Sequence, residues 1–137
     1  MKSHFDLTDD AFLHEFESCA LDPALFTHEA HLRLAWIHLE HYGEATAISN
    51  VSEQLMRYVD FLGARDKYNQ TLTTAAVKVV FHFMNKSRSD NFRDFITEFP
   101  RLNFNFRELM EQHYSLDIFN SEEAKQVFLE PDLVMFD

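Results

Sequence analysis

The sequence predicts an all-α protein, and its composition and periodicity both support this prediction. Only 2 Gly and 3 Pro occur among 137 residues, too few for a turn-rich β fold. Apolar residues recur at three- and four-residue spacing in successive segments, which is the pattern of amphipathic helices. With 46% hydrophobic and 26% charged residues, residues 1–137 are expected to form a single compact domain of about six to seven helices.

Polar capping residues and glycines bound the helices predicted in the N-terminal half. The hydroxyls of Thr8 and Thr27 can accept hydrogen bonds from N–H groups of a first helical turn. Gly43 and Gly63 can end a helix because glycine adopts positive φ angles without strain. Helices are therefore expected from Thr8 to about Ala20, over 28–42 and over 44–62.

A long apolar segment from Tyr68 to Asn85 is predicted to be the central helix, with the other helices around it. Ser89 or Asp90 is expected to cap the next, short helix, which Pro100 ends. Further helices are expected over 106–113 and 121–128.

The charge of the chain argues against nucleic acids and anionic membranes as partners. Twelve Lys and Arg stand against 23 Asp and Glu, a formal net charge of −11, and the basic residues form no patch. Cys19 is the single cysteine, and no apolar segment follows Met1, so a cytoplasmic protein without disulfides is expected. A small molecule or another protein remains as partner, and the oligomeric state is open.

Four of the eight histidines fall on the predicted helix 28–42, namely His28, His31, His38 and His41. A helical wheel places them on the apolar side, where an imidazole needs a hydrogen-bond partner, a metal or a ligand. His28 and His31 are three residues apart, so both could bind one divalent metal such as Zn or Fe. Core histidines bonded to backbone carbonyls are the simpler interpretation, and a neutral His28 could instead serve as a general base.

Polar residues near the start of the central helix are candidates for ligand binding. Tyr68, Asn69 and Thr71 are expected to line a pocket opposite the histidines, with contributions from His113 and Tyr114. The alternative is that Thr71 belongs to a narrow solvent-facing edge of that helix.

Four segments resemble those of a group of small bacterial all-helical proteins of about this length, to which no activity is assigned. These segments are Phe26-Thr-His-Glu-Ala-His-Leu-Arg-Leu-Ala-Trp36, Lys67-Tyr-Asn-Gln-Thr-Leu-Thr73, His113-Tyr-Ser115 and Phe128-Leu-Glu-Pro-Asp-Leu133. In that group the second segment commonly reads Tyr-His, whereas Asn69 stands here. The resemblance implies a helical fold, and the Asn69 difference weakens the case for a metal.

Three functions therefore remain open. The first is an enzyme, metal-dependent or acting on a small molecule, with a histidine-lined pocket at the start of helix 28–42. The second is a non-catalytic protein that binds an organic anion or an apolar molecule there. The third is an acidic protein-interaction domain whose histidines are purely structural.

Overall fold

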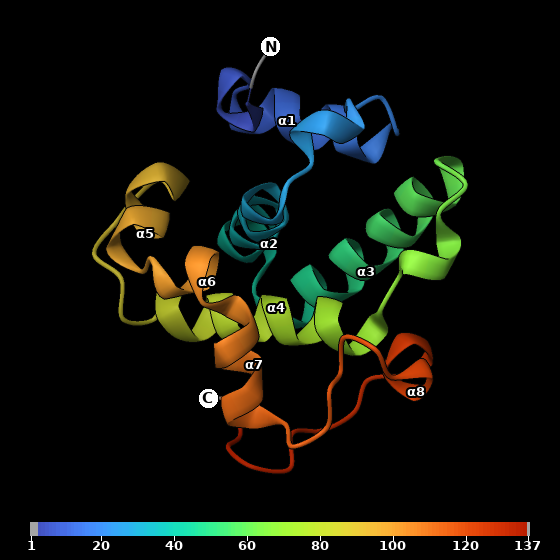
Figure 1. Ribbon diagram of the computed structural model, residues 1–137. Helices are drawn as coiled ribbons and strands as arrows, with labels where there is room; N and C mark the ends of the chain where they lie inside the picture. The colour runs from blue at the N-terminus through green and yellow to red at the C-terminus, as the bar shows by residue number, and fades with distance from the viewer. Residues whose placement is uncertain (1–2, 137) are drawn as a thin grey trace.

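The computed structural model describes residues 3–136, and it confirms an all-α fold (Figure 1). Eight α-helices lie in this range, one more than the upper number expected. They are α1 (Asp9–Glu17), α2 (His28–Tyr42), α3 (Glu44–Phe61), α4 (Gln70–Met84), α5 (Phe92–Glu98), α6 (Arg101–Phe104), α7 (Phe106–His113) and α8 (Glu122–Gln126). Three short 3₁₀ turns accompany them: His4–Asp6, Pro23–Leu25 and Arg65–Lys67.

The predicted caps of the N-terminal helices are present. Thr8 accepts a hydrogen bond from the Ala11 N–H, and Thr27 accepts one from the Ala30 N–H. Gly43 lies between α2 and α3 with φ of +81°, a conformation that favours glycine. Local side-chain chemistry thus sets where α1 and α2 begin and where α2 ends.

The C-terminal half differs from the expectation at several helix ends. Asn91, rather than Ser89 or Asp90, caps α5 by accepting a hydrogen bond from the Asp94 N–H. Pro100 ends α5 but also begins the unpredicted α6, because its fixed φ of −64° suits a first helical turn. The last helix, α8, ends at Gln126 instead of continuing to residue 128.

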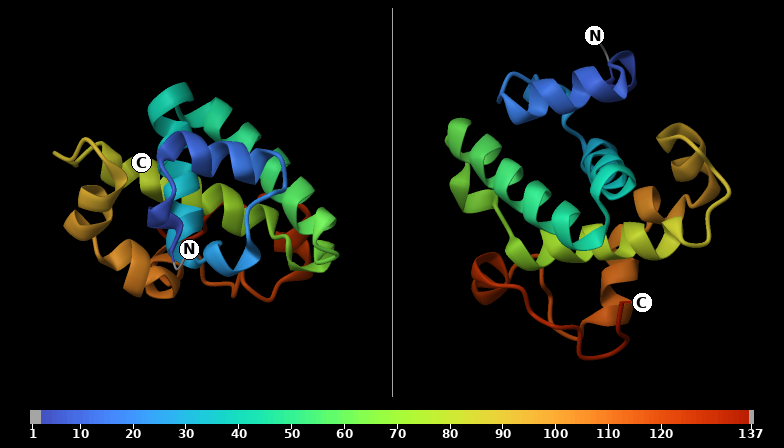
Figure 2. Two further views of the ribbon diagram at one scale, coloured as in Figure 1. Left: turned by 90° about the horizontal axis from the view of Figure 1, so that it is seen from above. Right: turned by 180° about the vertical axis from the view of Figure 1, so that it is seen from behind.

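Helices α2, α3 and α4 pack pairwise against one another and form the centre of the molecule. Figures 1 and 2 show α1 on one side of this group and α8, with the C-terminal segment, on the opposite side of α4. Helices α5, α6 and α7 lie together beside α2 and α4. Within residues 3–136, every helix is too short or too polar to cross a lipid bilayer.

Helix α2 is enclosed as fully as the central helix α4. All eight residues from Leu32 to Leu39 are buried, including the charged Arg33 and the polar His38. The helical wheel placed the four histidines on the apolar side of this helix, yet His28 and His41 are exposed. The histidine side of α2 is therefore only partly a core face.

A buried arginine joins the N-terminal segment to α2. The Arg33 guanidinium donates hydrogen bonds to the carbonyls of His4 and Leu7, at 2.6 and 2.9 Å, and to the Asp9 carboxylate at 2.8 Å. It also lies over the Phe12 ring, 4.8 Å from its centroid. His4 completes the network, because its Nε2–H donates to Glu29 at 2.8 Å. These contacts satisfy backbone groups that the segment before α1 would otherwise bury unpaired.

We predict that Arg33→Met destabilises the protein by roughly 2–4 kcal/mol, because two buried carbonyls and the His4 ring lose their donor. The control is Arg57→Met, since Arg57 is exposed and also donates to a carbonyl of α1. It should cost at most about 1 kcal/mol. Free energies of urea unfolding measure both effects, and equal losses in the two variants would contradict the structural role of Arg33.

Candidate functional site

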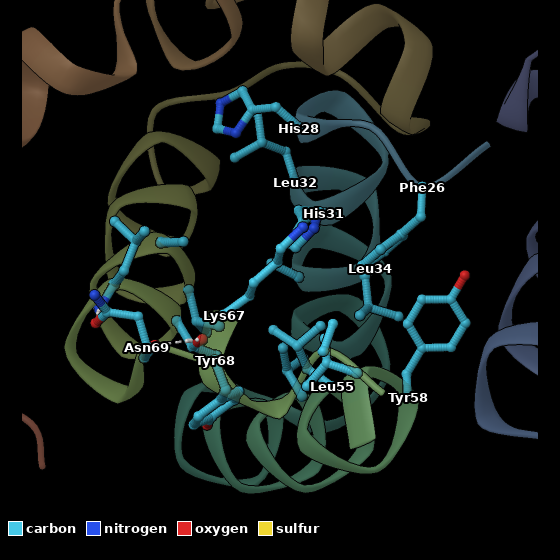
Figure 3. A pocket seen from close by; sticks show the side chains of 18 of the residues that line it. Phe26, His28, His31, Leu32, Leu34, Leu55, Tyr58, Lys67, Tyr68 and Asn69 are labelled. Atoms are coloured by element: carbon cyan, nitrogen blue, oxygen red, sulfur yellow. Dashed lines mark hydrogen bonds between the residues drawn. The ribbon is translucent and has the colours of Figure 1, made fainter. Parts of the chain in front are cut away.

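A cavity of about 500 Å³ lies between α2, α3 and α4 (Figure 3). Most of its wall is apolar, and several exposed residues, among them Pro23 and Leu62, show that it opens to solvent. The residues that line it are Pro23, Phe26, His28, His31, Leu32, Leu34, Ala35, Val51, Leu55, Tyr58, Val59, Leu62, Ala64, Lys67, Tyr68, Asn69, Leu72, Thr73, Ala76, Val77, Phe106 and Phe119. A volume of this size is typical of small-molecule sites.

Of the cavity's three titratable nitrogen groups, His31 is the least exposed, since His28 and Lys67 are both exposed. Its ring stacks on Phe26, with centroids 3.9 Å apart, and within the described chain neither ring nitrogen has a hydrogen-bond partner. Burial, with a smaller contribution from the charge of His28, lowers the pKa of His31 from 6.5 to about 4. The ring is therefore neutral at pH 7, and its accessible surface faces the cavity.

His28 lines the same cavity but is exposed, so the two histidines have different surroundings. Its Nε2–H donates to the carbonyl of Leu102, at 3.0 Å, and its ring packs edge-on against Phe106. In Figure 3 the His28 ring lies at one end of the cavity, and the His31 ring lies nearer its middle. With Nε2 used by the backbone, a neutral His28 keeps Nδ1 as an acceptor.

Tyr68 and Asn69 also line the cavity, but their polar atoms are used inside the protein. The Asn69 side chain accepts from the Leu72 N–H, as the N-cap of α4, and donates to the Ile118 carbonyl. The Tyr68 hydroxyl donates to Gln70 at 2.8 Å. Both side chains therefore form part of the cavity wall, but their polar atoms are already hydrogen-bonded within the protein.

The structure places the other predicted ligand-binding residues against the C-terminal segment. Thr71 is fully buried; its hydroxyl donates to the Val127 carbonyl and accepts from the Leu129 N–H. The Tyr114 hydroxyl donates to the Leu129 carbonyl, and a ring N–H of His113 donates to the Val134 carbonyl. These three side chains hold residues 127–136 against the helices, and none of them lines the cavity within the described chain.

Metal binding by His28 and His31 stays a prediction, and no third ligand lies beside them among residues 3–136. Across residues 3–136, no three His, Cys, Asp or Glu side chains are grouped so that they could hold a metal ion. A protein zinc site needs at least three such ligands. Asn69 stands where the similar proteins commonly have a histidine, and its side chain already forms two hydrogen bonds within the protein.

Lys67, Phe26 and Phe106 also line the cavity, although they were not predicted to do so. Lys67 is exposed at the cavity, and none of the ion pairs among the described residues includes it. Its position directly before Tyr68 was the available signal, but a surface lysine is ordinarily solvated. The two phenylalanines carry apolar side chains that the sequence cannot distinguish from core residues.

Two further histidines are buried away from this cavity. His38 is 3% exposed, and neither of its ring nitrogens has a hydrogen-bond partner within the described residues. Burial lowers the pKa of both His38 and His4 below 6.5, although Glu29 opposes the effect at His4. Like His31, both buried imidazoles are therefore stabilised in the neutral form.

We predict that acid destabilises the protein through these histidines. A folded-state pKa below the unfolded value of 6.5 means that the unfolded chain binds more protons. The stability contribution of neutral His31 is complete above pH 6.5 and is lost as the pH falls toward 4. Between pH 7 and 4.5, the wild type should lose about 2 kcal/mol more than His31→Gln.

Urea unfolding at several pH values measures this difference. The control is His14→Gln, because His14 is exposed on α1 and does not line the cavity. Its stability should follow the wild-type pH dependence. Parallel curves for the wild type and His31→Gln would show that His31 is not buried as described.

No family model, no curated protein and no solved structure matches this chain. The resemblance to small helical bacterial proteins consequently stays a prediction. Function must be inferred from the cavity itself, namely from its size, its apolar wall and the polar groups that its wall leaves unpaired.

Proposed function

We propose that the protein binds a small, mainly apolar organic molecule in the cavity between α2, α3 and α4. The observation that carries the proposal is an open cavity of about 500 Å³ whose wall is apolar apart from a few polar groups. Small-molecule sites combine such a wall with a few hydrogen-bonding groups that orient the ligand. Here His31 supplies the buried polar group.

The wall offers both aliphatic and aromatic surface. Leu32 comes from α2, and Leu72 and Val77 come from α4. The aromatic rings belong to Phe26, which precedes α2, and to Tyr58 of α3. Removing a ligand CH₂ group from water contributes about 0.8 kcal/mol. An eight-carbon chain can therefore offset the cost of association and bind with a Kd of roughly 10 µM to 1 mM.

Binding without catalysis is the function that the geometry supports best. Enzymes that use an activated nucleophile hold it within hydrogen-bond distance of a base. In the described cavity His31 has no hydrogen-bonded partner, and the His28 ring is bound to a backbone carbonyl. The wall therefore offers recognition groups rather than a catalytic pair.

An interaction domain with structural histidines is the third function that the sequence leaves open. In that case His31 would be expected to satisfy a buried polar group, as His4 does with Glu29. The His31 ring instead faces the cavity with both nitrogens unpaired among the described residues. This difference favours a ligand site over a purely structural role.

We predict that Ala76→Phe weakens binding, because Ala76 lines the cavity from α4 and a phenyl ring would occupy part of it. Octanoate and 1-octanol serve as probes, and amide NMR shifts of the cavity residues give the Kd. Binding to Ala76→Phe should be at least about tenfold weaker than to the wild type.

The control is Ala45→Phe, which adds the same ring at an exposed position of α3. It should bind both probes as the wild type does. If neither probe shifts the cavity resonances of the wild type, or if Ala76→Phe binds unchanged, the cavity is not a binding site for such molecules.

A further inference from the structure

The described residues that line the cavity include basic groups but no carboxylate. The chain contains 23 Asp and Glu, yet none of them is among the described residues that line the cavity. Its titratable nitrogen groups are His28 and His31 of α2 and Lys67 of the turn before α4. Tyr58 of α3 and Tyr68 supply hydroxyls, and the lining residues of α4 and α7 supply no titratable group. A cationic ligand would find no counter-charge here.

Most other polar side chains in the wall are already paired. Tyr58 donates to the Leu21 carbonyl, Tyr68 donates to Gln70, and Thr73 donates to the Asn69 carbonyl. Asn69 uses both its oxygen and its nitrogen. The side-chain groups left for a ligand are the His31 ring, Nδ1 of His28 and the ammonium group of Lys67.

Of these groups, His31 has the strongest reason to bind a ligand head group. Lys67 and His28 are exposed, so water can satisfy them. The His31 ring is only partly exposed, because it stacks on Phe26 and lies among apolar side chains, so it keeps less contact with water than His28 or Lys67. A ligand group that bonds to it would replace this limited hydration and gain specificity.

We propose, on the basis of the binding function above, that the ligand is a monocarboxylic acid with an apolar body whose carboxyl group binds the His31 ring. The apolar body would contact Leu72, Ala76 and Val77 of α4. Lys67 would hold a positive charge near the cavity mouth and attract the anion.

Protons are balanced by uptake from solvent. At pH 7 the free acid is a carboxylate and free His31 is neutral, since its pKa is about 4. An unpaired carboxylate is expensive to bury, so the complex binds one proton that lies between the carboxyl oxygen and the ring nitrogen. The number of protons taken up is one whichever of the two atoms carries it.

This balance also selects the head group. One imidazole that takes up one proton neutralises one negative charge. A phosphate monoester carries about −1.5 to −2 at pH 7 and would leave charge unbalanced beside an apolar wall. An alcohol could bond to His31, but it would bring no charge and take up no proton.

The test is calorimetric titration of octanoate and 1-octanol at pH 7 in two buffers of different ionisation enthalpy. We expect wild-type protein to take up close to one proton with octanoate and none with 1-octanol. His31→Gln should lose the proton uptake and bind octanoate at least about tenfold more weakly, with 1-octanol affinity within about threefold. Lys67→Gln should keep the uptake, because Lys67 is not the proton acceptor.

Each other outcome is decisive. If 1-octanol binds as tightly as octanoate, or if His31→Gln keeps the uptake, the carboxylic acid proposal is wrong while the cavity remains a binding site. If Lys67→Gln weakens octanoate binding and His31→Gln does not, the carboxylate binds near Lys67 at the cavity mouth, and the proposal is again wrong. If neither probe binds, the proposed function itself fails.

Discussion

The enclosure of α2 is the constraint on which the rest of the structure depends. Polar side chains on a helix surrounded by protein must bond to other groups or open to a cavity. Arg33 bonds to the N-terminal segment, and His28 bonds to the backbone of α6. The ring nitrogens of His38 form no hydrogen bond within the described residues, while His31 opens to the cavity. One helix thus attaches the N-terminal segment, holds α6 and supplies the buried polar group of the site.

The helices could be predicted from the sequence wherever local chemistry sets their ends. Thr27 and Gly43 bound α2 through a hydroxyl cap and a positive φ, and both effects depend on a few neighbouring residues. Helix α6 was missed because Pro100 can stop one helix and start another, and the sequence indicated only the stop. The burial of Arg33 was equally hidden, since its partners lie 24 to 29 residues earlier.

The candidate site was predictable in part for the same reason. The three-residue spacing of His28 and His31 placed both on one side of a helix, and both line the cavity. Thr71 and Tyr114 show the limit, because their role depends on where the C-terminal segment lies. The Thr71 hydroxyl bonds to residues 56 and 58 positions later, and no periodicity indicates such a pairing. A polar residue on a buried helix therefore predicts a partner without identifying it.

The size of the cavity adds a thermodynamic argument for a ligand. Packing defects cost about 24 cal/mol per Å³, so a dry, sealed void of about 500 Å³ would cost on the order of 10 kcal/mol. That is comparable with the total stability of an ordinary domain. The fold can keep this space because it opens at exposed residues such as Lys67 and admits water. Hydrogen bonds from Asn69 to Ile118 and from His28 to Leu102 join the elements beside it, so collapse of the wall would break them. Water against an apolar wall is readily displaced by an apolar molecule, and this exchange supplies the driving force for binding.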